Sequence, residues 1–253
     1  MHTEEKYIAL GKLAASRASN KDLLSELTTN YSVEHDCARM DALGLHLQVV
    51  VKSSPPNYLH GYVLAAVARH YMTKHEGPVV AVDVGTARGF SALVLSEALR
   101  ASNRKGVVHT IDIVDSTTPQ HDNCLLSAKW KRPVSTVECA KHPEGAADVV
   151  EEYIRFHVGD SLAVIHALRL PRIHIAFLDG HHAYEHVKAE LALVSSKQQK
   201  GDVIVCDDYT RTQFDGLCRA VDEFASSHSY MLQIHRGVDE SRVRGYAVLT
   251  KQS

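Results

Sequence analysis

Hydrophobic and polar residues follow two different periods along this chain. Residues 79–84 (VVAVDV) form an apolar, β-branched run, and from residue 90 onward apolar side chains recur every three or four positions. A glycine-bracketed segment at 85–89 (GTARG) lies between the two. The pattern predicts a strand, a tight loop and an amphipathic helix. A helix start of this kind presents free backbone N–H groups and a positive dipole end to an anion.

The same alternation of strand and helix continues to the end of the chain. Further strands are predicted at 107–111, 156–158, 173–178 and 203–206, helices at 183–195 and around 214–224, and a closing strand pair at 230–234 and 245–250. We therefore expect an α/β fold with a mixed seven-stranded sheet and helices on both of its faces.

Two segments fall outside this rhythm. Residues 1–75 have helical spacing, interrupted at 53–57 (SSPPN), and are expected to form a helical cap on a main domain of residues 76–253. A purely structural or dimerising extension is the alternative for this segment. Residues 115–155 form a long connection between two strands, which is typical either of a lid over a binding site or of a disordered insertion.

Composition narrows the class of protein. With 253 residues, 45% of them hydrophobic, the chain is long enough for one α/β domain with an extension. A net charge of −2 gives no electrostatic reason to expect nucleic acid or an acidic membrane as a partner. The five cysteines include no C-x-x-C pair, and no apolar run has the length of a signal peptide or a membrane span. A reducing, cytoplasmic environment is the expectation.

Acidic residues stand at or just after the ends of the predicted strands. Because an open parallel sheet binds ligands at the carboxyl ends of its strands, we expect these acids to surround a ligand. Asp112, after the second strand, is placed to hold a ribose diol, and Asp160 and Ser161, after the third, to face an adenine. A helix N-cap is the alternative for Asp160 and for Asp208.

Three carboxylates come from two neighbouring strand ends: Asp179, Asp207 and Asp208. Mg²⁺ prefers a few carboxylates and water, so these residues form a candidate magnesium site. The alternative is that one acid caps a helix and another pairs with a basic residue. His182, three residues beyond Asp179, is placed to take a hydroxyl proton or to bind the ion. Since the chain contains 17 histidines, a structural role is the alternative for this residue.

Several motifs together resemble the class I S-adenosylmethionine (SAM) methyltransferases. They are D-x-G-x-x-x-G at 83–89, Asp112, G-D-S at 159–161, FLDGHHAYE at 177–185 and GDVIVCDDY at 201–209. The D-G-x-H-x-Y-E stretch looks most like the macrocin O-methyltransferase-like group of sugar and natural-product methyltransferases. The acidic strand ends look like those of catechol O-methyltransferases, which hold Mg²⁺ with three such side chains.

The resemblance implies a Rossmann-like class I methyltransferase fold and SAM-dependent, magnesium-assisted methylation of a hydroxyl on a sugar, phenol or other small natural product. The cofactor-binding residues that it implies are Asp83, Gly85, Thr86, Ala87, Gly89, Phe90, Ser91, Asp112, Asp160, Ser161 and Asp179. Asp83 would meet the SAM ammonium, directly or through water. The implied metal ligands are Asp179, Asp207 and Asp208, and the implied catalytic residues are His182 and Asp179. His182 falls where catechol-type enzymes place a lysine base.

Other functions stay open at this point. A methyltransferase that acts on N or O without a metal would need the same cofactor motifs, and so would a SAM-binding regulatory subunit without catalysis. The glycine spacing does not fit the G-x-G-x-x-G of a nicotinamide-dependent oxidoreductase. The apolar helices of residues 1–75 make a homodimer plausible.

Overall fold

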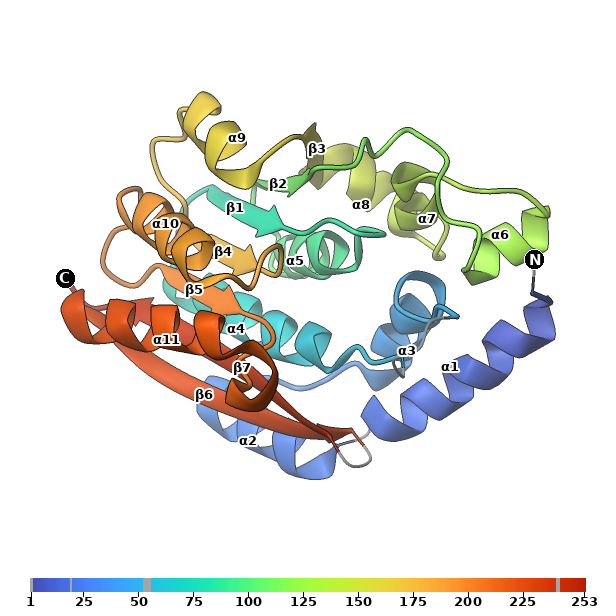
Figure 1. Cartoon of the computed structure of the whole chain (residues 1–253), viewed down its shortest axis with the longest axis horizontal. Helices are drawn as coiled ribbons and strands as arrows, with labels where there is room; N and C mark the ends of the chain where they lie inside the picture. Colours follow the sequence, from blue (N-terminus) through green and yellow to red (C-terminus); the bar gives the residue numbers. More distant parts are fainter. Residues whose placement is uncertain (1, 19, 52–55, 240–241) are drawn as a thin grey trace.

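A computed structural model describes the whole chain except residues 1, 19, 52–55 and 240–241 (Figure 1). The predicted break at 53–57 therefore lies largely outside the described residues. The centre of the molecule is a seven-stranded sheet with the order β3-β2-β1-β4-β5-β7-β6. Strands β3, β2, β1, β4 and β5 run parallel to one another, while β7 is antiparallel to both β5 and β6. The predicted mixed seven-stranded sheet is confirmed.

The strands lie close to their predicted positions. They are β1 Val79–Val84, β2 Gly106–Asp112, β3 Ile154–Val158, β4 Ile175–Leu178, β5 Val203–Cys206, β6 Tyr230–Asp239 and β7 Arg242–Lys251. The central strands are buried on both faces, so their sequences read as continuous apolar runs. Successive residues still alternate between two hydrophobic cores. Ile175 and Phe177 pack in one core, and Ala176 and Leu178 in the other.

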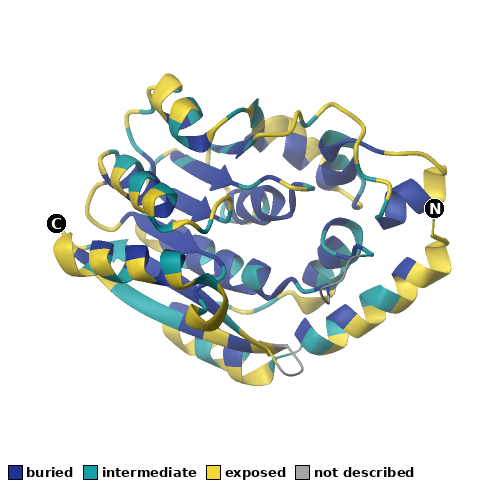
Figure 2. Ribbon diagram, viewed as in Figure 1, coloured by how far each residue is buried: buried dark blue, intermediate teal, exposed yellow. Residues whose placement is uncertain are grey.

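Helices cover both faces of this sheet, as predicted. On one face lie α4 Leu59–Lys74, α5 Phe90–Ala101 and α8 Ala146–Tyr153, and on the other α9 Ser161–Ala167, α10 Tyr184–Ser195 and α11 Arg211–Ser227. Figure 2 shows the consequence, with buried residues along the strands and on the inner sides of the helices, and exposed residues on the outer sides. The sheet is therefore the middle layer of three.

The first part of the chain is helical, with α1 Glu4–Ala18, α2 Lys21–Tyr31 and α3 Cys37–Leu47 preceding α4. Helix α2 packs against α4 and β6, and α1 packs against α3 and α6. Buried Tyr7, Leu27 and Leu43 join these helices to the same core that lies under α5. No helix in the described part of the chain has both the length and the apolar character required to cross a membrane.

Residues 115–155 form an ordered, helical segment and not a disordered insertion. It contains α6 Leu125–Trp130, α7 Thr136–Lys141 and α8. Ser135 and Glu138 form a capping box at the start of α7, which explains why so short a helix is stable there. Thr136 donates a hydrogen bond of 2.7 Å from Oγ1 to the carbonyl of Ala87. The segment therefore packs directly against the glycine loop after β1.

Candidate functional site

The site lies at the carboxyl ends of the parallel strands, where the chain turns sharply after β1. Gly85 and Gly89 have φ values of +94° and +84°, which L side chains rarely adopt. At Gly85 a Cβ atom would also lie 2.4 Å from the carbonyl oxygen of Asp179. The backbone conformation of the loop therefore requires glycine at both positions. At Gly85 the missing side chain also lets the ends of β1 and β4 approach each other. Helix α5 begins directly after the loop, at buried Phe90.

A cavity of about 370 Å³ opens beside this loop, and we call it the cofactor cavity. Its walls come from the ends of β1 to β4 and from α10. They are Val84, Gly85, Ala87, Ile111, Asp112, Ile113, Gly159, Asp160, Ser161, Asp179, Gly180, His181, His186 and Glu190. Six of the predicted cofactor residues belong to this wall: Gly85, Ala87, Asp112, Asp160, Ser161 and Asp179. Asp83, Thr86, Gly89, Phe90 and Ser91 are not wall residues and belong to the strand, loop and helix beside it.

Asp83 is fully buried next to the cavity wall and only partly satisfied. Its Oδ2 accepts a hydrogen bond of 2.5 Å from Thr110, whose hydroxyl also lies 2.6 Å from that of Thr86. Its Oδ1 is buried and has no hydrogen-bond partner. Burial raises the pKa of this carboxyl from 3.8 to about 6, while its interactions with the hydroxyls of Ser91 and Thr110 oppose the rise. A buried acceptor without a donor is costly, so a cationic donor bound here would satisfy it.

The carboxylate of Asp112 is held in place by the backbone. Its Oδ2 accepts from the N–H of Ala87 at 3.0 Å, and its Oδ1 accepts from the N–H of Val114 at the same distance. Each carboxylate oxygen has a second lone pair, which leaves acceptors for a diol. Asp160 does cap a helix, since its Oδ1 accepts from the N–H of Ala163 at the start of α9. It lines the cavity as well, so its role as a cap does not remove it from the predicted site.

A polar cluster of Ser161, His186 and Glu190 forms part of the cavity wall. Ser161 donates a hydrogen bond of 2.5 Å to Glu190, and Nε2 of His186 lies 3.2 Å from the same carboxylate oxygen. Burial raises the pKa of Glu190, while its contacts with Ser161 and His186 oppose the rise. The cluster gives the cavity wall both hydrogen-bond donors and acceptors. His186 and Glu190 were not predicted from the sequence.

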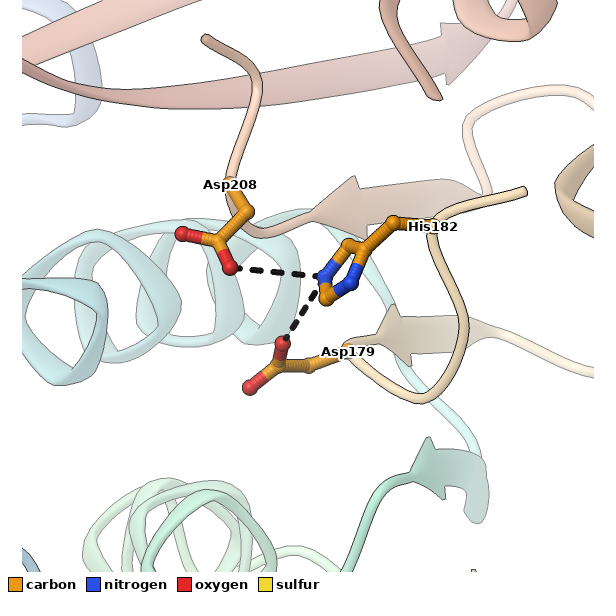
Figure 3. A group of neighbouring side chains, drawn as sticks. All are labelled: Asp179, His182 and Asp208. Carbon is orange, nitrogen blue, oxygen red and sulfur yellow. Dashed lines mark ion pairs between the residues drawn. The ribbon is translucent and has the colours of Figure 1, made fainter. Parts of the chain in front are cut away.

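A second group of ionisable side chains lies at the ends of β4 and β5 (Figure 3). It consists of Asp179, His182 and Asp208, each of which offers a ligand atom within 4.8 Å of the others, and we call it the acid–histidine group. Nε2 of His182 lies 3.3 Å from Asp208 and 3.9 Å from Asp179, yet it is buried and forms no hydrogen bond of good geometry. From β7, Nη1 of Arg244 lies 3.5 Å from Asp208.

Asp207 does not join this acid–histidine group. Its Oδ1 accepts from the N–H of Asp208 at 2.7 Å, and its Oδ2 lies 3.6 Å from Nδ1 of His60 on α4. Burial, and then the neighbouring carboxylate of Asp208, raise the pKa of Asp207 to about 7. Asp208 has a left-handed backbone with a φ of +57°, which directs the two adjacent side chains to different neighbours. The third ligand atom of the group therefore comes from His182, where the sequence predicts Asp207.

Several residues around the two groups carry no signal in the sequence. His181 lines the cofactor cavity and is not among the residues predicted for the site. His60 on α4 reaches Asp207, and Arg244 on β7 reaches Asp208, from more than 100 and more than 30 residues away in the chain. Only the i, i+4 spacing of His186 and Glu190 on a predicted helix would have indicated that these two side chains face the same way.

Comparisons with known proteins agree with this geometry. Residues 82–209 match a family model described as a methyltransferase domain. A search of curated protein sequences finds no match. Among solved structures, the O-methyltransferase TomG from Streptomyces achromogenes, crystallised with SAM and involved in tomaymycin synthesis, has a TM-score of 0.59 at 17% identity over 93% of this chain and 99% of its own.

Two further structures have the same fold. The O-methyltransferase from Bacillus cereus, in complex with SAH, gives a TM-score of 0.58 at 13% identity, over 89% of this chain and 96% of that one. The SAH-bound methyltransferase PaMTH1 from Podospora anserina gives 0.54 at 15% identity, over 90% and 93%. Because the family model covers half of the sequence, this chain belongs to the methyltransferase domain family and is a methyltransferase built on the fold of the O-methyltransferases.

Proposed function

We propose that this enzyme uses SAM to methylate a hydroxyl of a small molecule, with the help of a divalent cation. The main support for this proposal is the position of Asp179. Asp179 belongs both to the wall of the cofactor cavity and to the acid–histidine group. A methyl donor in the cavity and an acceptor at the acid–histidine group would therefore meet beside Asp179. Reacting groups held in contact in this way have lost most of the entropy that separates them in solution.

The residues of the cofactor cavity fit SAM. When bound, SAM supplies a methyl group made electrophilic by its sulfonium. The unpartnered Oδ1 of Asp83 fits the ammonium of its methionine part, and the start of α5 fits the carboxylate. Asp112 would accept hydrogen bonds from the ribose hydroxyls. The buried cluster around Glu190 and exposed Ile113 would border the adenine, one with polar groups and one with an apolar face.

The acid–histidine group fits a divalent cation. Its buried imidazole nitrogen faces two carboxylate oxygens without a hydrogen bond, an arrangement that leaves room for an ion between them. Such an ion would orient an acceptor hydroxyl and lower its pKa. Two carboxylates and one imidazole suit Mn²⁺ better than Mg²⁺, which prefers oxygen ligands alone. We therefore extend the magnesium prediction to divalent cations, with Mn²⁺ favoured.

The chain's own residues account for the proton of the acceptor hydroxyl. Asp179 and His182 are ionisable side chains beside the proposed transfer point. With an ion bound, the carboxylate of Asp179 would accept that proton, and in a site without an ion Nε2 of His182 would accept it. Phe214 packs against the ring of His182 at a centroid distance of 4.2 Å and fixes its orientation. The cationic Arg244 beside Asp208 favours a second candidate, a methyltransferase that needs no metal, because it already offsets part of the negative charge.

The motif resemblance supports a small natural product as the acceptor. The D-G-x-H-x-Y-E stretch is similar to that of macrocin-type enzymes, and TomG, one of the similar solved structures, is involved in tomaymycin synthesis. A cytoplasmic location is supported by five cysteines that are all free. A homodimer through the N-terminal helices is supported by Ile8 and Leu13 on α1, each 44% exposed.

Titration calorimetry tests this proposal on the purified chain. We expect SAM and SAH to bind and NAD to give no signal. After treatment with a chelator, added Mn²⁺ should bind to the parent and bind at least about 100-fold more weakly to His182→Ala, because an ion loses a ligand there. His186→Ala, which removes a histidine of the cofactor cavity, is the matched control and should leave Mn²⁺ binding unchanged. Absence of SAM binding by the folded parent contradicts the proposal, and equal Mn²⁺ affinities favour the metal-free candidate.

A further inference from the structure

Two thiols face each other under the glycine loop. Cys124 precedes α6 and Cys139 lies on α7, and their Sγ atoms are 4.0 Å apart. Both side chains are fully buried. They come from the segment of residues 115–155, whose helices lie beyond the carboxyl end of β1 in Figure 1. The pair belongs neither to the cofactor cavity nor to the acid–histidine group.

A cation from the glycine loop lies beside this pair. Arg88 donates a hydrogen bond of 2.8 Å from Nη2 to Asn123, the residue before Cys124, while its Nε is buried without a partner. In the described part of the chain its guanidinium forms no ion pair with a carboxylate. A largely desolvated cation is stabilised by a nearby anion, and the thiol of Cys124, which interacts with Arg88, supplies one when it ionises.

The surroundings of Cys124 favour its thiolate form. A hydrogen bond with the thiol of Cys139, hydrogen bonds with Ser127 and the charge of Arg88 lower the pKa of Cys124 to about 5, against the opposing effect of burial. The pKa of Cys139 is raised, because it shares that hydrogen bond and is buried. One thiolate beside one protonated thiol is the arrangement from which a disulfide forms readily.

The pair is mechanically linked to the loop that would hold the cofactor. Asn123 anchors Arg88, and Thr136 anchors the carbonyl of Ala87. At Gly89 a Cβ atom would lie 2.9 Å from the Cβ of Ala140, so α7 touches the loop without a gap. Each cysteine is therefore adjacent in sequence, or within one helical turn, to a residue that positions the loop.

We propose that Cys124 and Cys139 are a redox modification site, oxidised by hydrogen peroxide to a disulfide that weakens binding at the cofactor cavity. The thiolate of Cys124 attacks one oxygen of the peroxide and the O–O bond breaks. Hydroxide departs, and Cys124 becomes a sulfenic acid. The thiol of Cys139 then attacks that sulfur, and its proton leaves with the displaced oxygen as water. In sum, two thiols and one peroxide give one disulfide and two waters. A dithiol reductant reverses the change.

Closing the disulfide brings the two sulfur atoms from 4.0 Å to about 2.05 Å apart. Rotation of the two side chains supplies part of this approach, and the remainder would move the start of α6 and the middle of α7 toward each other. Such a shift pulls Asn123 and Thr136 from their partners in the loop. We expect SAM affinity to fall about tenfold, the size expected when one hydrogen bond of the loop is lost. This last step rests on the proposed function.

Peptide mass mapping and SAM titration on the same samples test the proposal. After mild peroxide treatment of the folded chain, the peptides containing Cys124 and Cys139 should be joined and the protein should be lighter by two hydrogen atoms. SAM affinity should fall about tenfold and recover with dithiothreitol. Cys139→Ser and Cys139→Ala should resist this loss, whereas Cys218→Ser, which changes a buried thiol on α11, should behave like the parent.

The possible failures are distinguishable. If peroxide gives no Cys124–Cys139 link in the folded parent, the modification site is wrong. If the link forms and SAM affinity stays the same, the coupling to the cofactor cavity is wrong. If the reduced parent binds no SAM, the proposed function fails, while mass mapping still reports on the disulfide by itself. Thermal unfolding of the two Cys139 variants shows whether each is folded before it is compared.

Discussion

Replacing Asp83 with asparagine should stabilise the free enzyme while it weakens SAM binding. Asp83 is fully buried, and its pKa of about 6 lies above the value of 3.8 that applies in the unfolded chain. The folded state therefore binds the proton more tightly than the unfolded state. Below about pH 4 both states are protonated and Asp83 brings no penalty. As the pH rises through 6, the buried charge forms and stability is lost.

The size of this effect follows from the two pKa values. Raising a pKa from 3.8 to about 6 corresponds to about 3 kcal/mol of unfolding free energy lost at neutral pH. The asparagine side chain of Asp83→Asn would carry no charge and would still accept the hydrogen bond from Thr110. Its amide group would need an acceptor where Oδ1 now has no partner, which costs about 1 kcal/mol. We expect a net stabilisation of about 1–3 kcal/mol at pH 7.5.

Urea denaturation without SAM, between pH 3.5 and 8, measures this difference. The parent should lose stability relative to Asp83→Asn between about pH 4 and 6, and at pH 3.5 the parent should be the more stable of the two by about 1 kcal/mol. Asp160→Asn is the control, since Asn caps a helix as well as Asp does. SAM affinity should fall at least tenfold in Asp83→Asn, because its ammonium loses a charged partner. A variant no more stable than the parent at pH 7.5 would refute the reasoning from burial.

Three other substitutions test separate parts of the site. Gly85→Ala should lower stability by more than Gly145→Ala: both glycines have a positive φ, but only at Gly85 would a Cβ lie 2.4 Å from the carbonyl oxygen of Asp179. Thermal unfolding measures the difference, and equal losses of stability would contradict this prediction. Asp112→Ala should weaken SAM binding by about 1.5–3 kcal/mol in calorimetry, while Asp115→Ala, which removes a carboxylate that accepts hydrogen bonds from Thr117, should not. The same loss in both variants would remove Asp112 from the ribose site. Asp208→Asn should lower Mn²⁺ affinity at least about 100-fold, and Asp207→Asn about tenfold or less. The reverse order would show that the ion binds beside Asp207 and His60 instead.

The fold could be predicted from the sequence because most of its signals are local. The runs Val79–Val84 and Val203–Cys206 are strands with the predicted bounds, since a central parallel strand needs an uninterrupted apolar sequence. The closing pair is longer than predicted, because β6 and β7 pair with each other through polar residues such as His235 and Arg236. Hydrogen bonding along a hairpin needs no apolar pattern, so the sequence carried no sign of those residues.

The site could be predicted only in part, for a similar reason. Asp112 and Asp179 stand at strand ends, and a strand's direction determines the edge of the sheet where its last residue lies. Which neighbour an acid contacts depends on the turn after the strand. The left-handed backbone of Asp208 separates it from Asp207, and no residue pattern announces that turn. Arg244 and Glu190 come from distant elements, so only the packed structure brings them to the site.

The most direct test of a SAM-dependent methyltransferase site at this loop is a crystal structure of the chain grown with SAH and Mn²⁺. The account predicts the adenine beside Ile113 and the Glu190 cluster, the ribose hydroxyls on Asp112, and the amino group within hydrogen-bonding distance of Asp83. It also predicts an ion bound by Asp179, His182 and Asp208. SAH bound anywhere outside the cofactor cavity, or a cavity that stays empty at saturating SAH, would contradict the account.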